Sequence, residues 1–239
     1  MNFLNLLIFR TRELEKIGKM HGTDKATRLG YVKTYERLFR GIRKDKLKLL
    51  EIGVGDTGAS HKMWKDYFPN GEIYCMDLFH LETQKSLQKE LQDYGVHTFK
   101  GNQLSRHDLN SLVDSIGRDF DIILDDGAHL WDAIQLSLGL LFPVLKPGGF
   151  YIVEDCRTAT RRGRDLDKVN ANLAAFNINE RHCPEFHLKE SLVHSENTNV
   201  WKSSVLKEKE KKYLAKNIAT WEFSEDKRLC VVRKKAIRA

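Results

Sequence analysis

The stretch that decides the fold is LKLLEIGVGDTGAS, at residues 47–60. Its first half is an almost continuous apolar run, which suits a strand buried on both faces of a parallel sheet. Its second half carries Gly53, Gly55 and Gly58, which permit a sharp backbone turn and a close approach to a ligand. Residues 61–68 (HKMWKDYF) then predict a helix whose free N–H groups would face that ligand. The pattern indicates a strand, a glycine-rich turn and a helix.

The same alternation continues along the chain and indicates an α/β protein. Strands are expected at 71–79, 96–102, 119–127 and 150–155, and helices at 81–95, 105–117 and 129–145, with a KPGG turn at 146–149. Such alternation predicts a doubly wound, mostly parallel Rossmann-like sheet. Residues 220–235 (TWEFSEDKRLCVVRKK) resemble a β-hairpin, so a C-terminal antiparallel hairpin is expected as well.

The flanking segments are less regular. Residues 1–20 and 34–42 predict amphipathic helices, with a loop over 21–31 between them. Beyond the fifth strand we expect a polar loop at 156–168 and a helix near 169–178. A further candidate strand at 185–194 leaves the order of the last strands open.

Composition sets the class of protein. The 239 residues are 41% hydrophobic and 31% charged, which favours one globular domain with or without appendages. A mean hydropathy of −0.48 and the lack of an apolar run near 18 residues argue against a membrane-spanning helix. The apolar opening at 3–9 lacks the features of a secretory signal. Four widely spaced cysteines fit reduced thiols in a cytoplasmic protein better than disulfides or a zinc site: Cys75, Cys156, Cys183 and Cys230.

Charge is unevenly distributed along the chain. Residues 1–50 carry a net +8, residues 51–201 a net −8 and residues 202–239 a net +7. Basic flanks are compatible with an anionic partner such as nucleic acid. Solvated helix faces and loop lysines explain them equally simply, and we favour that interpretation. The acidic centre then needs an explanation of its own.

One acidic residue of this centre follows the glycine-rich turn at a meaningful distance. Asp77 lies nineteen residues after Gly58, at the end of the second strand, where a carboxylate accepts hydrogen bonds from ribose hydroxyls. The spacing suits a dinucleotide equally, and an ordinary tight turn is the simplest alternative. Glu51 favours S-adenosylmethionine, because a carboxylate repels a pyrophosphate but does not repel a sulfonium amino acid.

A second acidic group follows two neighbouring strands. DIILDDGAH (121–129) and FYIVED (150–155) place Asp125, Asp126, Glu154 and Asp155 at the carboxyl ends of strands, which face the ligand crevice. Four carboxylates there repel one another unless they are protonated or bound to a cation. Asp126, Glu154 and Asp155 would suit octahedral Mg²⁺, and His129 would suit a general base.

There is a simpler interpretation of the same residues. Asp126 and Asp155 would be helix N-caps, and His129 would be a surface residue. Helix capping does not explain why both acidic pairs meet at one edge of the sheet. We therefore favour the interpretation in which these residues form a metal site with a general base.

Several motifs together resemble a known family. LLEIGVG (49–55), DIILDDGAH (121–129), LFPVLKPGG (141–149) and YIVED (151–155) are similar to class I S-adenosylmethionine-dependent methyltransferases. Within that class the chain most resembles metal-dependent O-methyltransferases that act on sugars of macrolides and other glycosylated natural products. GTDK (22–25), with Tyr31, Tyr35 and Glu36, resembles the segment that precedes the nucleotide fold in that family. The resemblance covers roughly residues 20–160.

The resemblance implies a function and a set of site residues. It implies methyl transfer to a hydroxyl of a sugar or glycosylated small molecule, with S-adenosylmethionine and Mg²⁺, or Mn²⁺ in its place, as cofactors. Residues 1–46 would form an N-terminal helical cap or lid segment and 47–239 the methyltransferase domain, in a homo-oligomer. The implied site comprises Glu51, Gly53, Gly55, Ser60, Asp77, Asn102 and Gln103 at the cofactor, Asp126, Glu154 and Asp155 at the metal, and His129 as the base.

The chain departs from the family at several points, which include a glycine-rich loop shorter than in the macrolide enzymes and a basic C-terminal region from Trp201 that does not match the family. Asn102 stands where an acidic residue is usual, and Ala128 stands where serine is usual. These departures bear on the acceptor more than on the chemistry.

Three other functions compete with this one. A nucleic-acid methyltransferase would use the basic flanks, but an NPPY-like base-flipping motif is absent, so nucleic acid is not an expected partner. A nicotinamide oxidoreductase would share the glycines and Asp77 but has no use for four carboxylates. A non-catalytic metal-binding or scaffold protein of the same fold is the third.

Overall fold

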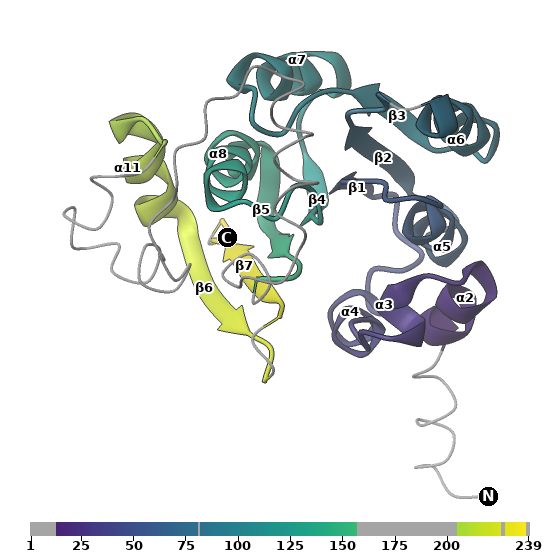
Figure 1. Cartoon of the computed structure of the whole chain (residues 1–239). Helices are drawn as coiled ribbons and strands as arrows, with labels where there is room; N and C mark the ends of the chain where they lie inside the picture. The colour runs from purple at the N-terminus through teal and green to yellow at the C-terminus, as the bar shows by residue number, and fades with distance from the viewer. Residues whose placement is uncertain (1–12, 81, 157–204, 226–227, 238–239) are drawn as a thin grey trace, which may run out of the picture.

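The computed structural model describes residues 13–80, 82–156, 205–225 and 228–237, and Figure 1 shows their arrangement. Within these residues, seven strands form one sheet in the order β3-β2-β1-β4-β5-β7-β6. The strands are β1 (Lys48–Ile52), β2 (Glu72–Asp77), β3 (His97–Lys100), β4 (Phe120–Asp125), β5 (Leu145–Val153), β6 (Ile218–Phe223) and β7 (Cys230–Lys234). The first five are parallel, and β7 is antiparallel to both β5 and β6. The predicted sheet and its C-terminal antiparallel hairpin are confirmed.

Helices cover both faces of this sheet (Figure 1). One face carries α2 (Glu13–His21), α3 (Asp24–Thr27), α4 (Val32–Phe39), α5 (Ala59–Tyr67) and α6 (Glu82–Asp93). The other carries α7 (Arg106–Ile116), α8 (Trp131–Leu141) and α11 (Glu208–Asn217), with the short 3-10 helix η1 (Phe142–Val144) after α8. Successive strand residues point to opposite faces, so Leu49 and Leu50 enter different apolar clusters. Burial on both faces explains the continuous apolar runs of the central strands.

The N-terminal helices share an apolar cluster with the sheet. Tyr35 and Phe39 of α4 pack around Trp64 of α5, and the rings of Tyr35 and Trp64 lie 5.3 Å apart, edge to face. This packing sets α3 and α4 above the carboxyl ends of β1 and β5. That residues 1–46 act as a cap or lid stays a prediction.

Several expectations about local structure differ from the observed elements or lie outside the described residues. The predicted loop 21–31 contains the single helical turn α3, and the predicted KPGG turn belongs to β5, which begins at Leu145 because that residue pairs with Phe120. The sequence does not predict the helix α11. Its residues are mostly charged (EKEKKYLAKN), so the apolar face that includes Leu214 is not apparent from the pattern. The expected loop at 156–168 beyond Cys156, the helix near 169–178 and the strand at 185–194 lie outside the described residues.

Within the described part of the chain, no helix has the length and apolar character needed to cross a membrane.

Candidate active site

A cavity of about 650 Å³ opens at the carboxyl ends of the parallel strands. It lies where the strand order reverses between β1 and β4, which is the usual ligand site of an open α/β sheet. Its walls come from α3, the glycine-rich turn, the end of β2 and the loops after β3, β4 and β5. The predicted site residues in its lining are Gly53, Gly55, Ser60, Asp77, Asn102, Gln103, Asp126, His129 and Asp155.

The glycine-rich turn is needed for a close approach between two loops. Gly53 has a φ of +92°, and a Cβ atom there would lie 2.1 Å from the backbone oxygen of Asp126. Gly58 has a φ of +60° and precedes α5 directly. Glycine is therefore required at position 53 because the loop after β4 packs directly against it. This contact places that loop beside the cavity.

Asp77 holds this turn in place. Its Oδ2 atom accepts a 2.8 Å hydrogen bond from the backbone N–H of Val54. The side chain also lines the cavity, which is where a ribose-binding carboxylate has to lie. Asp77 therefore supports the glycine-rich turn structurally, and its contact with a ribose stays a prediction.

Gln103 and Asp125 form a buried network beside the cavity. The Gln103 amide donates to Asp125 at 2.7 Å, and its oxygen accepts from the Ala128 backbone at 2.8 Å. The hydroxyls of Ser137 and Tyr151 also donate to Asp125, which is 1% exposed. Asp125 was expected in the crevice with the other carboxylates, but it does not line the cavity. Asp125 is the last residue of β4, and its side chain points away from Asp126, toward the face of the sheet that carries α8.

Glu51 is fully buried behind the cavity wall. Its carboxylate accepts hydrogen bonds from the Ser60 hydroxyl at 3.0 Å and from the Trp64 indole at 2.9 Å. The ring of His61 lies 3.4 Å away, and burial lowers the pKa of this histidine, although the Glu51 charge opposes the shift. Ser60 lines the cavity and Glu51 does not. A direct contact between Glu51 and the cofactor stays a prediction.

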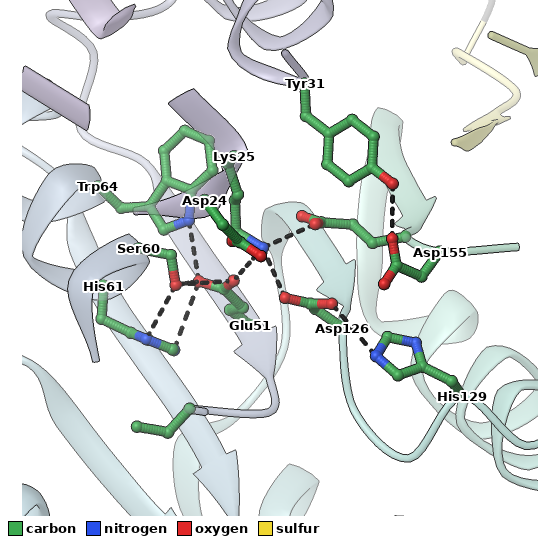
Figure 2. Close-up of polar contacts among 12 residues, drawn as sticks. Asp24, Lys25, Tyr31, Glu51, Ser60, His61, Trp64, Asp126, His129 and Asp155 are labelled. Atoms are coloured by element: carbon green, nitrogen blue, oxygen red, sulfur yellow. Dashed lines mark hydrogen bonds and ion pairs between the residues drawn. The ribbon is translucent and has the colours of Figure 1, made fainter. Parts of the chain in front are cut away.

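Lys25 of α3 lies at the centre of the acidic group (Figure 2). Its ammonium is 2.6 Å from Asp126, 2.7 Å from Glu154 and 3.2 Å from Glu51. Burial by itself would lower the pKa of Lys25, but the three carboxylates outweigh burial and raise this pKa well above its ordinary value. Lys25 is therefore a buried cation among three carboxylates.

Two tyrosines of the same segment hold the acidic pair after β5. Tyr31 donates a 2.6 Å hydrogen bond to Asp155, and Tyr35 donates one of the same length to Glu154. Asp155 lines the cavity, whereas Glu154 is 1% exposed and points toward Lys25. Burial and the neighbouring charge of Asp126 raise the pKa of Glu154 well above its ordinary value, and Lys25 opposes this.

The carboxylates form two overlapping groups. Ligand atoms of Asp126, His129 and Asp155 lie within 4.8 Å of one another, and so do those of Glu51, Asp126 and Glu154. The predicted metal ligands are thus divided, because Glu154 faces inward and Asp155 faces the cavity. Asp126 belongs to both groups. Their carboxylate oxygens are the ligands that Mg²⁺ prefers, so the residues present fit a hard divalent cation.

The backbone at this site adopts an uncommon conformation. His129 and Asp155 have φ values of +54° and +53°, in the left-handed region that residues other than glycine rarely adopt.

The Nε2 atom of His129 lies 3.6 Å from Asp126, and the histidine side chain is 10% exposed. The capping alternative is wrong for Asp126, since α8 has its N-cap at Leu130. His129 is also no ordinary surface residue.

Sequence reasoning missed Lys25, the buried cation of this site. The GTDK segment (22–25) is distinctive in the sequence only through its resemblance to a family, and nothing in it predicts a role for Lys25. A lysine in a short polar segment carries no local signal of burial. The hint in the sequence was the excess of carboxylates in the crevice, which called for a cation.

Comparisons with known proteins bear on the fold and on the class of protein. No family model matches the sequence. A methyltransferase of the mycinamycin pathway, solved with Mg, S-adenosylhomocysteine and mycinamycin VI, superposes with a TM-score of 0.69 at 26% identity, over 95% of this chain and 56% of that one. The fold is therefore that of class I methyltransferases.

Curated relatives narrow the resemblance to one group of that class. Mycinamicin VI 2''-O-methyltransferase of Micromonospora griseorubida is 38% identical over 52% of this chain. An 8-demethyl-8-alpha-L-rhamnosyl tetracenomycin-C 2'-O-methyltransferase of Streptomyces olivaceus is 37% identical over 58% of it. The matches span only 31% and 36% of those relatives. The predicted similarity to sugar O-methyltransferases is confirmed.

Proposed function

We propose that this chain is an S-adenosylmethionine-dependent O-methyltransferase that requires Mg²⁺ and acts on a hydroxyl of a sugar or glycosylated small molecule. The observation that carries the proposal is the cavity in which Asp77 and the glycine-rich turn share one space with Asp126, His129 and Asp155. A cofactor on one side and an acceptor on the other would meet there. The similarity to sugar O-methyltransferases supports the acceptor class.

The cofactor would occupy the wall formed by the turn and β2. Asp77 would accept hydrogen bonds from the ribose hydroxyls, which are charge-assisted and therefore strong. The turn at Gly53 and Gly55 lines the cavity and would let the cofactor approach the main chain closely, with Ser60, Asn102 and Gln103 completing the wall. Glu51 would act through Ser60, whose hydroxyl it holds.

The metal would be held by Asp126, Glu154 and Asp155. A bound Mg²⁺ supplies a Lewis acid that lowers the pKa of an acceptor hydroxyl. Asp155→Asn keeps the shape of the side chain and removes one charge. We expect metal affinity, measured by calorimetry, to fall in this variant while the fold and S-adenosylhomocysteine binding survive.

The protein itself would align the reactants and accept the proton. His129 borders the cavity beside Asp126, where its ring can take the proton from the acceptor hydroxyl. The deprotonated acceptor oxygen would then take the methyl group of S-adenosylmethionine, and S-adenosylhomocysteine would leave. Holding both reactants in this alignment would be the larger contribution to the rate.

The decisive experiment uses methyl-labelled S-adenosylmethionine and a panel of glycosides, with and without excess chelator. Label transfer that chelator abolishes and Mg²⁺ restores is the expected result. Full activity in excess chelator, or calorimetric binding of NADH in place of S-adenosylhomocysteine, would contradict the proposal. Submicromolar binding of RNA or DNA at physiological salt would favour the nucleic-acid alternative.

A further inference from the structure

We infer that Lys25 is a positioning residue whose ammonium serves as the internal cation of the acidic centre, holding Asp126 and Glu154 together with Glu51 before any metal binds. The inference rests on the proposed metal-dependent function. It assigns a task to the GTDK segment, which lies outside the nucleotide-binding part of the fold.

The contacts of Lys25 join three separate parts of the chain. Glu51 lies in β1, Asp126 follows β4, and Glu154 follows β5. One ammonium contacts all three carboxylates at 2.6–3.2 Å, and Lys25 itself is 1% exposed. Figure 2 shows the ammonium between Glu51 and Asp126. Removing this group would leave charges from three elements without their shared partner.

The carboxylates need such a partner because they are buried. Glu51 is 0% exposed and Glu154 is 1% exposed, so water screens neither charge. Ligand oxygens of Glu51, Asp126 and Glu154 lie within 4.8 Å of one another, a separation at which like charges repel strongly. Tyr35 donates to Glu154 and Ser60 to Glu51, but neither donor carries a positive charge. Lys25 supplies the positive charge that this group lacks.

Lys25 also connects the two halves of the cavity. Through Glu51 it reaches Ser60 on the cofactor wall, and through Asp126 and Glu154 it reaches the predicted metal ligands. The ammonium and a divalent cation would therefore neutralise the same carboxylates. A protein without the ammonium should depend on the metal for its folding stability, because a ligand that binds only the folded state stabilises it.

The test compares melting temperatures of Lys25→Met in chelator and in saturating Mg²⁺ with those of the parent protein. We expect Lys25→Met to melt about 6–20 °C lower than the parent in chelator, as for a broken buried ion pair. Mg²⁺ should raise the melting temperature of the variant by at least about 4 °C more than it raises that of the parent.

The matched control is Lys234→Met. Lys234 is also a buried lysine, at 9% exposure, but its ammonium donates to the carbonyl oxygens of Phe142, Pro143 and Leu145. The control should lose stability equally with and without Mg²⁺. The inference is wrong if Lys25→Met loses stability equally with and without Mg²⁺, as the control does, or if its melting temperature equals that of the parent.

A second variant tests the same point in chelator alone. Lys25→Met combined with Glu154→Gln removes the cation and one of the charges it neutralises. We expect the double variant to be more stable than Lys25→Met, including where the single variant fails to fold. A double variant that is as unstable as Lys25→Met or less stable would overturn the inference. Failure of the proposed function is separable, because methyl transfer and Mg²⁺ binding are measured on the parent.

Discussion

The phenol of Tyr31 donates a 2.6 Å hydrogen bond to Asp155, across 124 positions of the sequence. Four residues later on the same segment, Tyr35 donates to Glu154. One short helical segment therefore orients both members of the acidic pair, Asp155 toward the cavity and Glu154 toward Lys25. The two carboxylates therefore lie in different surroundings, although they are adjacent in the sequence.

The first prediction concerns Asp77 and the cofactor. Asp77→Ala should weaken S-adenosylmethionine binding by about 1.5–3 kcal/mol, since hydrogen bonds to a charged group are lost. The variant also loses the acceptor of the Val54 N–H, so a melting curve must accompany the calorimetry. Asp114→Ala, at an exposed position of α7, is the control. A folded Asp77→Ala protein with the affinity of the parent would exclude the ribose contact.

The second prediction concerns His129, which the geometry allows as a base or as a metal ligand. As a base, His129→Ala should lower turnover by roughly 10²–10⁴ and leave Mg²⁺ affinity nearly intact. Part of the activity should return at high pH, where hydroxide removes the proton. His107→Ala, on the exposed side of α7, should match the parent. Loss of Mg²⁺ binding in His129→Ala would assign the residue to the metal, and unchanged turnover would remove both roles.

The third prediction concerns the stability that Tyr35 contributes. Tyr35→Phe leaves the Glu154 carboxylate without one donor in a buried place, so we expect a loss of about 1–3 kcal/mol in the free energy of unfolding. Tyr74→Phe removes a tyrosine–glutamate hydrogen bond at the surface and should cost about 0.5 kcal/mol or less. Denaturant titration of both variants measures the difference. Equal losses would mean that the Tyr35 hydroxyl has no special place in the acidic centre.

The fourth prediction concerns the buried thiols. Burial raises the pKa of Cys156 from 9.0 to about 12 and also raises those of Cys75 and Cys230. Thiols of the unfolded chain ionise near pH 9, whereas these remain protonated in the fold. Their contribution to stability is therefore full below pH 9 and declines as the pH rises toward 12.

Denaturant titrations at pH 8 and at pH 11 measure this decline, and thiol labelling checks the burial that causes it. Peptide mapping at pH 8 should find all three described cysteines unlabelled in the native protein and labelled in guanidinium. Native labelling at the unfolded rate would show that the three sites open readily.

The sequence by itself determined the fold class and most of the cavity wall. Continuous apolar runs occur only where both faces of a strand are buried, and the glycine-rich turn followed by Asp77 marks one edge of a parallel sheet. These signals are local, so they were available without any tertiary contact. The same logic placed Asp126, His129 and Asp155 at that edge.

Only the tertiary structure decided which charges meet. Asp125 and Asp126 are adjacent in sequence, yet one enters a hydrogen-bond network on a helix-covered face and the other contacts Lys25. Lys25 contacts Glu154 across 129 positions of the sequence, a separation that no local sequence pattern can predict. The position of α3 depends on apolar packing of α4 against α5, and that packing brings a lysine from a polar segment into the acidic centre. Long-range packing, rather than local pattern, therefore set the charge balance of the site.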